Sequence, residues 1–150
     1  MVAIIGGEVK RFRPLVDLYR ETGRQAGYSA EQLRVGVHMP GYVAPTTQEA
    51  AKDFFPGWAS AIASVAKERG WPPVTRADFD AQRGPGGALL VDTPEEVAEK
   101  VARHSEALGG ISRVSLQMTP ASLPHGKLLR AIEAIGERVA PALRETREAA

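Results

Sequence analysis

The chain has 150 residues, 43% hydrophobic and 25% charged, which is typical of one folded domain and excludes a disordered chain. Its 19 basic and 18 acidic side chains give a formal net charge of +1, so no long-range field attracts nucleic acid or an anionic membrane. The lack of cysteine excludes disulfides, thiolate nucleophiles and cysteine-based metal sites. With neither a signal peptide nor an apolar run of membrane-spanning length, we expect a cytoplasmic protein without nucleic-acid or membrane partners.

The N-terminal region predicts a strand followed by a helix. Residues 2–5 are apolar and read as a buried strand, and Gly6 and Gly7 form the turn that follows it. Residues 9–26 carry apolar side chains three and four positions apart, which is the pattern of one buried helix face. Gly27 is in the place of a helix C-cap.

A second strand is predicted before another helix start. Leu33, Val35 and Val37 alternate with small or polar residues up to His38, and the extended region continues to Ala44. The following "TTQE" has the form of a capping box, in which a threonine and a glutamate each satisfy the other residue's free backbone N–H.

Residues 46–87 predict an irregular helical insertion. A helix is expected to begin at Thr46 and to break at Pro56-Gly57, with a second helix from Trp58. The later part, "GWPPVTRADFDAQRGPGG", is rich in glycine and proline and has room for only a short helix after Thr75.

Aromatic side chains gather in this insertion. Trp58, Trp71 and Phe79 either line a substrate lid or pack a small helical subdomain.

The C-terminal half returns to regular elements. Residues 88–91 predict a short strand, and Thr93 followed by proline and two glutamates is a strong helix start. Residues 114–118 predict the last strand and residues 128–139 a closing helix, after which the polar tail from Arg144 is expected to fray.

This alternation predicts an α/β fold of βα units with parallel strands in a single domain, residues 1–150. In such folds the functional groups lie at the carboxyl ends of the strands. Those ends hold Gly6-Gly7, His38 and Gln117.

Each candidate residue at these ends has a functional and a structural interpretation. Gly6-Gly7 either lets the backbone approach a phosphate or forms a plain tight turn, since no G-x-G-x-x-G fingerprint is present. His38 either contacts a ligand or has a structural role, and Gln117 is placed to point into a sheet or barrel interior. His104 and His125 share no metal-ligand spacing with His38, so we expect no metal site.

The order of these landmarks resembles the C-terminal part of bacterial luciferase-like monooxygenases. The more specific stretches are "FFPGW", "RGWPP" and "GALLVDTPEEVAEKV", and the resemblance extends over residues 3–143. It implies part of a TIM barrel and an oxidoreductase that uses FMN, or a deazaflavin in some members, on a small organic substrate. It also implies a flavin or substrate site with His38 as a catalytic-site polar contact and with Gly6, Gly7 and Gln117 near the cofactor.

The resemblance also implies a truncated chain, because a TIM barrel takes about 250 residues and this chain has 150. A slice of a barrel leaves open sheet edges, from which we expect a homo-oligomer. Two interpretations follow: a flavin-dependent oxidoreductase segment, or a non-catalytic oligomeric remnant that keeps the fold without a complete flavin site and binds no cofactor. A standalone small-molecule binding module is a third.

Overall fold

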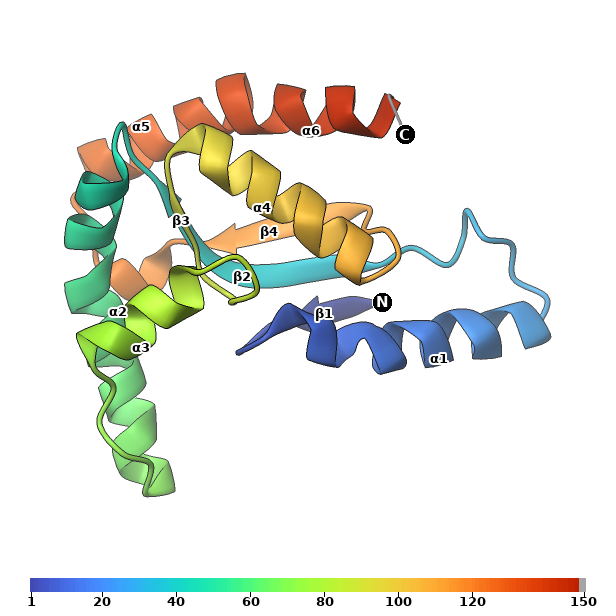
Figure 1. Ribbon diagram of the computed structural model, residues 1–150, viewed down its shortest axis with the longest axis horizontal. Helices are drawn as coiled ribbons and strands as arrows, with labels where there is room; N and C mark the ends of the chain where they lie inside the picture. The colour runs from blue at the N-terminus through green and yellow to red at the C-terminus, as the bar shows by residue number, and fades with distance from the viewer. Residues whose placement is uncertain (149–150) are drawn as a thin grey trace.

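The computed structural model describes residues 1–148, with side chains described as far as residue 146. Strands and helices alternate along the chain, as the sequence predicts (Figure 1). The strands are β1 (Val2–Ile4), β2 (Gly36–Val43), β3 (Leu90–Asp92) and β4 (Arg113–Gln117). The α-helices are α1 (Arg13–Gln25), α2 (Thr47–Arg69), α3 (Arg76–Arg83), α4 (Pro94–Ala107), α5 (His125–Ala134) and α6 (Ala140–Glu148). Short helical segments are η1 (Val9–Phe12), η2 (Thr119–Ala121) and η3 (Ile135–Val139).

The four strands form one parallel sheet organised around β2. Both β1 and β4 pair with Gly36, Val37 and His38, so they lie on opposite edges of β2. β3 pairs further along, at Gly41–Val43. The predicted α/β class, with parallel βα units in a partial barrel-like arrangement, is confirmed.

The Pro40-Gly41 pair marks the point where β2 changes partners. Pairing with β1 ends at His38, and Pro40 has no N–H to donate to a further residue of β1. A Cβ on Gly41 would lie 2.6 Å from a methyl group of Leu116 and 3.1 Å from the carbonyl oxygen of Leu90. A residue larger than glycine would therefore push β3 and β4 away from β2.

The sheet has one face covered by helices and one open face. Ala3, Val37 and Met39 point to the covered face and are buried in the core. α4 packs there against β3, η1 and α6. In Figure 1, α1 lies beside β1 at one edge of the sheet, and α5 and α6 lie toward the other edge, beyond β4.

The predicted helix starts are confirmed where a threonine provides the cap. The side chains of Thr46, Thr75 and Thr93 each accept a hydrogen bond from the backbone N–H three residues later. The complete capping box, with the reciprocal bond, forms at Thr75 and Asp78. At Thr46, where the sequence predicts a capping box, only the bond from the backbone N–H of Glu49 to the threonine hydroxyl forms, so that prediction holds for the helix start and not for the reciprocal bond. These contacts are local, so the sequence specifies them directly.

The predicted break at Pro56-Gly57 is wrong, because α2 is one helix that contains Pro56. Proline costs this helix one backbone hydrogen bond. Phe54 and Trp58, on either side of the break point, are both buried in the core and hold the two halves in line. Gly57 has a packing role instead, since an added Cβ would lie 2.2–2.5 Å from backbone atoms of Ala121.

The aromatic residues of the insertion divide into a packed group and an exposed one. The ring of Phe79 lies 5.2 Å from the rings of both Phe55 and Trp58, which fixes α3 against α2. Trp71 is exposed, and the guanidinium of Arg69 lies over its ring. The packing interpretation therefore fits Trp58 and Phe79, while Trp71 lies outside that cluster.

The closing helical region is longer than predicted. Instead of residues 128–139, it runs from α5 through the wider turn of η3 into α6, which ends at Glu148. The tail from Arg144 is therefore helical as far as Glu148, and the last part of the predicted frayed tail, residues 149–150, lies outside the described residues.

Substituting Gly57→Ala should destabilise the fold by about 1–3 kcal/mol, because the new methyl group overlaps the backbone of η2. Gly136→Ala is the matched control, since no atom lies within 4 Å of its added Cβ, and it should stabilise by about 0.5–1 kcal/mol. Urea denaturation of both variants measures the difference. Equal effects of the two substitutions would contradict the close approach of α2 and η2.

Candidate functional site

Two of the predicted site residues, His38 and Gln117, lie on the open face of the sheet. We define the open face as the side chains of Val2, Ile4, His38, Arg113, Ser115 and Gln117, which point away from the covered face. Ile4, His38 and Ser115 are aligned across β1, β2 and β4. Residues aligned in parallel strands point to the same side, so these three form one row across the sheet.

A polar pair occupies the middle of this row. The Nδ1 atom of His38 lies 3.2 Å from the hydroxyl oxygen of Ser115. His38 is half-buried and Ser115 is exposed, so the ring is held at one nitrogen while the pair remains in reach of a ligand. Such a pair can both donate and accept hydrogen bonds.

Apolar side chains flank the pair on the β1 side. Val2 and Ile4 are 67% and 75% exposed although they belong to a sheet. An apolar floor beside a hydrogen-bonding pair is the lining expected of a site for a flat ring with a polar edge.

Gln117 lies one row further toward the carboxyl end. It is aligned with Pro40 of β2, and its side chain is exposed. Its amide provides one acceptor oxygen and two donor hydrogens on the same face as His38.

Gly6 and Gly7 continue β1 toward the same end of the sheet. The backbone N–H of Ile5 donates to the carbonyl of His38, which extends the path of β1 by one residue beyond the strand. Gly7 has a φ of 79°, a conformation that favours glycine. The left-handed backbone alone accounts for Gly7, while Gly6 has open space around it.

A second polar cluster, which the sequence alone does not predict, lies at the carboxyl end of β2. The Nζ of Lys127 lies 2.6 Å from both carboxylate oxygens of Asp53, which also accepts from the hydroxyl of Tyr42 at 3.1 Å. Burial, together with the Asp53 carboxylate, raises the pKa of Tyr42 to about 12. The cluster joins β2, α2 and α5, and Tyr42 is buried with the ring of Phe54 stacked on it, so its hydroxyl is used inside the protein. The alternation His38, Pro40, Tyr42 was the signal that could have found it.

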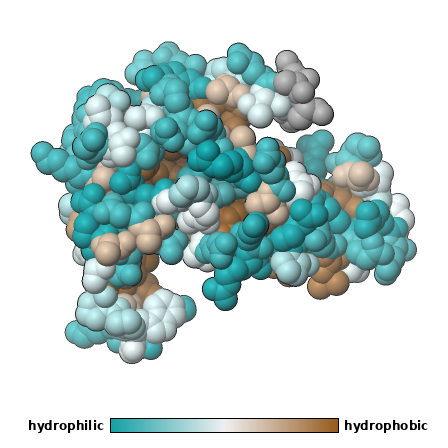
Figure 2. All heavy atoms as spheres, viewed as in Figure 1, coloured by the Kyte–Doolittle hydropathy of each residue, from teal (hydrophilic) through white to brown (hydrophobic). Residues whose placement is uncertain are grey.

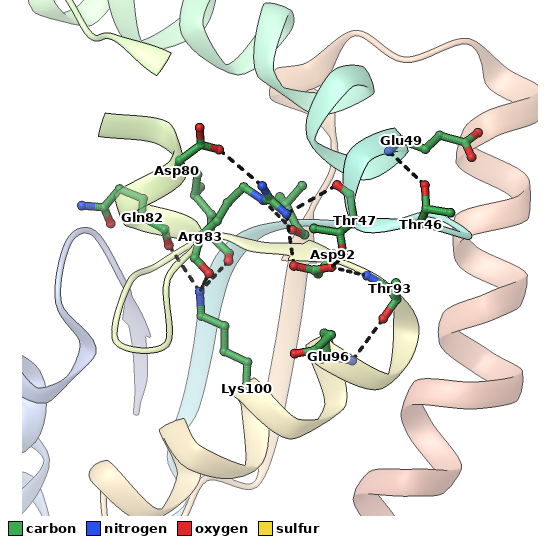
Figure 3. Close-up of polar contacts among 12 residues, drawn as sticks. Thr46, Thr47, Glu49, Asp80, Gln82, Arg83, Asp92, Thr93, Glu96 and Lys100 are labelled. Atoms are coloured by element: carbon green, nitrogen blue, oxygen red, sulfur yellow. Dashed lines mark hydrogen bonds and ion pairs between the residues drawn. The ribbon is translucent and has the colours of Figure 1, made fainter. Parts of the chain in front are cut away.

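A larger polar cluster lies where β3, α3 and α4 meet (Figure 3). Arg83 donates to the carboxylate of Asp92 at 3.1 Å and to the carbonyl of Val91 at 2.9 Å. Asp92 also accepts from the hydroxyl of Thr47 and from the backbone N–H of Thr93. These charges neutralise one another, which indicates a structural role.

Lys100 completes this cluster from α4. Its Nζ donates to the carbonyls of Gln82, Arg83 and Leu89, so all three ammonium hydrogens are used (Figure 3). Burial, with Arg83 nearby, lowers the pKa of Lys100 to about 8. The lysine fixes the loop between α3 and β3, and it presents no free hydrogen to a ligand.

Of the other two histidines, His104 is buried on α4 and His125 is exposed at the start of α5. Among the side chains that the structure describes, as far as residue 146, no three His, Asp or Glu side chains gather in a way that could hold a metal ion. None of the helices in the described part of the chain is long and apolar enough to cross a membrane.

No protein-family model matches the sequence, and no curated protein matches it. Solved structures share its fold. One is the oxygenating constituent of 3,6-diketocamphane monooxygenase from the CAM plasmid of Pseudomonas putida in complex with FMN, a type II Baeyer-Villiger monooxygenase, with a TM-score of 0.72 and 21% identity over 95% of this chain. A second is the monooxygenase RslO1 from Streptomyces bottropensis, with a TM-score of 0.70 and 24% identity over 93%.

The fold also matches the coenzyme F420-dependent tetrahydromethanopterin reductase from Methanopyrus kandleri, with a TM-score of 0.60 and 16% identity over 95% of this chain. The chain has the fold of part of these enzymes. It spans 42%, 40% and 45% of the three matched chains, less than half of each. At these identities the likeness concerns the fold alone.

Because His104 is buried, we expect the free energy of unfolding to fall in mild acid. Burial, with Lys100 nearby, lowers the pKa of His104 from 6.5 to about 4. Between these values the unfolded chain binds a proton that the folded chain does not, so stability falls as the pH falls. From pH 7 to pH 5 we expect a loss of about 2 kcal/mol from this group.

Urea denaturation at both pH values, with His104→Leu beside His125→Gln, measures this contribution. His104→Leu should remove most of the difference between the two pH values. His125→Gln, at an exposed site, should leave it unchanged. The same pH dependence in all three proteins would contradict the assignment to His104.

Proposed function

We propose that the chain is the C-terminal segment of a luciferase-like, flavin-dependent oxidoreductase or monooxygenase, and that its open face forms one wall of the flavin site. The observation that carries the proposal is the polar pair of His38 and Ser115 beside the apolar Val2 and Ile4, in a fold shared with an FMN-complexed monooxygenase. The F420-dependent reductase with the same fold supports FMN or a deazaflavin as the cofactor class.

The side chains on the open face fit such a cofactor. Val2 and Ile4 would contact the flat face of the ring, and His38 and Gln117 would donate to or accept from its polar edge. Gly6 leaves room beside them, because no atom lies within 4 Å of its added Cβ. When bound, the flavin supplies the redox chemistry, and these residues orient it beside a small organic substrate.

His38 acts in this proposal as a polar contact and not as an obligatory acid or base. The hydroxyl of Ser115 holds Nδ1, which leaves Nε2 as the nitrogen for a ligand.

As a partner we propose a second copy of the chain in the cytoplasm. Within the described residues, β1 and β4 each pair with β2 alone and so have one unpaired edge, and Val2 and Ile4 are exposed on β1. Unpaired strand edges beside an apolar face favour association with another strand. The near-zero net charge gives no reason to propose a nucleic-acid or membrane partner.

A second candidate function is a non-catalytic oligomer that retains the fold without a complete flavin site. The observation that favours it is the exposure of the open face, on which Val2 and Ile4 are 67% and 75% exposed. Under this alternative the exposed side chains of the open face are covered by the second copy alone.

Titration of FMN into the purified chain, followed by flavin fluorescence, distinguishes the two. We expect saturable binding that His38→Ala and Gln117→Ala each weaken about tenfold, the effect of losing one hydrogen bond of about 1.4 kcal/mol. Gln25→Ala, an exposed amide on α1, is the matched control and should bind like the original chain. If FMN and F420 both fail to bind at any soluble concentration, the flavin proposal is wrong and the second candidate remains.

A further inference from the structure

Large apolar side chains are exposed along α1 at the β1 edge of the sheet. Leu15 and Leu18 of α1, and Tyr28 shortly after its end, are each more than half exposed. With Tyr19 and Leu33 they line a groove of about 540 Å³, which we call the α1 groove. Figure 2 shows hydrophobic atoms at the surface along this helix. A groove of this size and lining would bury several apolar side chains if a partner filled it.

A matching apolar ridge lies on α5, after β4. Leu129 and Ile132 are three positions apart, which is close to one helical turn, and each is more than half exposed. We call these two residues the α5 ridge. In Figure 1, α5 and α1 belong to opposite edges of the molecule, so the ridge cannot reach the groove of its own chain.

We propose that two copies of the chain associate so that the α5 ridge of each fills the α1 groove of the other, with β1 of each copy beside β4 of its partner. This inference rests on the self-association in the proposed function, and it names the surfaces that limit the assembly to two chains.

Symmetry supports this arrangement. Each copy has one sheet edge at β1 and another at β4, on opposite sides of β2. A twofold axis along the strand direction keeps the strands of both copies parallel, as a βα barrel requires. The same axis creates two identical β1–β4 contacts, so the two sheets close on each other and leave neither of these edges free.

The position of each surface in its βα unit fits the same assembly. α1 follows β1, and α5 follows β4 after the short η2. In a βα barrel the helices of neighbouring units lie side by side outside neighbouring strands. When β1 of one copy lies beside β4 of the other, the α1 groove and the α5 ridge therefore become neighbours without any change of fold.

A second copy explains the exposed side chains better than an unrelated partner does. Both surfaces, at the two edges of the chain, expose large apolar side chains, and the one on the α1 side is a groove that such side chains can enter. Val2 and Ile4, exposed on the open face next to β1, would become interior residues of the closed assembly. The same contact thus covers the open face, the strand edges and the helix surfaces together.

The test measures solution molar mass by light scattering for the original chain and for Leu18→Lys and Ile132→Glu. We expect the original chain to have twice its 16.1 kDa mass, and each variant to dissociate with at least a tenfold higher dissociation constant. Both substituted side chains are exposed, so circular dichroism should show an unchanged fold. Val65→Glu, at an exposed apolar position of α2 outside both surfaces, is the control and should remain dimeric.

Mixing the two variants provides a sharper outcome. In a mixed dimer one groove–ridge contact pairs the introduced lysine of Leu18→Lys with the introduced glutamate of Ile132→Glu, and the other contact is unchanged. The mixture should therefore regain the dimeric mass. A monomeric original chain, a Leu18→Lys or Ile132→Glu variant that associates as tightly as the original chain, or a mixture that associates no better than the separate variants would overturn the inference.

Titrating FMN into the same samples separates this inference from the flavin proposal. A dimer that obeys the mixing test and binds no flavin supports the inference and contradicts the flavin proposal. A monomer that binds flavin overturns the inference and leaves the flavin proposal in place.

Discussion

The whole sheet depends on hydrogen bonding to β2, the one strand among those described that pairs with all the others. Its first part pairs on both edges, with β1 and with β4, and its last part pairs with β3. Pro40 and Gly41 stand between these parts. Pro40 ends the pairing with β1 without leaving an unpaired N–H, and Gly41 lets β3 and β4 approach the same strand. A proline and a glycine, usually a sign of a turn, are here what allows one strand to have three neighbours.

Parallel pairing around one strand also determines where polar groups meet. His38, Ser115 and Ile4 come from three separate strands, and register alone brings them into a row. The hydrogen bond between His38 and Ser115 joins residues 77 positions apart in the chain. The clusters of Arg83 with Asp92 and of Lys100 with three carbonyls hold α3 and β3 in place, and their donors are used internally. The open face is therefore where polar atoms combine with exposed apolar surface.

The sequence predicts features that depend on contacts between residues close together in the chain, and it does not predict features that depend on contacts between distant segments. The helix starts at Thr46, Thr75 and Thr93 depend on contacts three residues apart, and the sequence predicts all three. The continuity of α2 through Pro56 depends on buried partners far along the chain, which no local pattern of proline and glycine encodes.

The residues of the candidate site likewise include some that the sequence predicts and some that only the structure reveals. His38 and Gln117 could be chosen from the sequence because strand ends are visible in it, and the structure places both on the open face. Ser115 was missed because its importance depends on the register of β4 against β2. Asp53 and Lys127 were missed because their pairing depends on the packing of α2 and α5.

A flat ligand bound to the open face contacts protein on one of its two sides only. Val2 and Ile4 are exposed in the single chain, so nothing there covers the other side of the ligand. In the proposed dimer, the second copy provides the other wall of the site and shields the ligand from water. Ligand binding and dimer association would therefore strengthen each other by mass action.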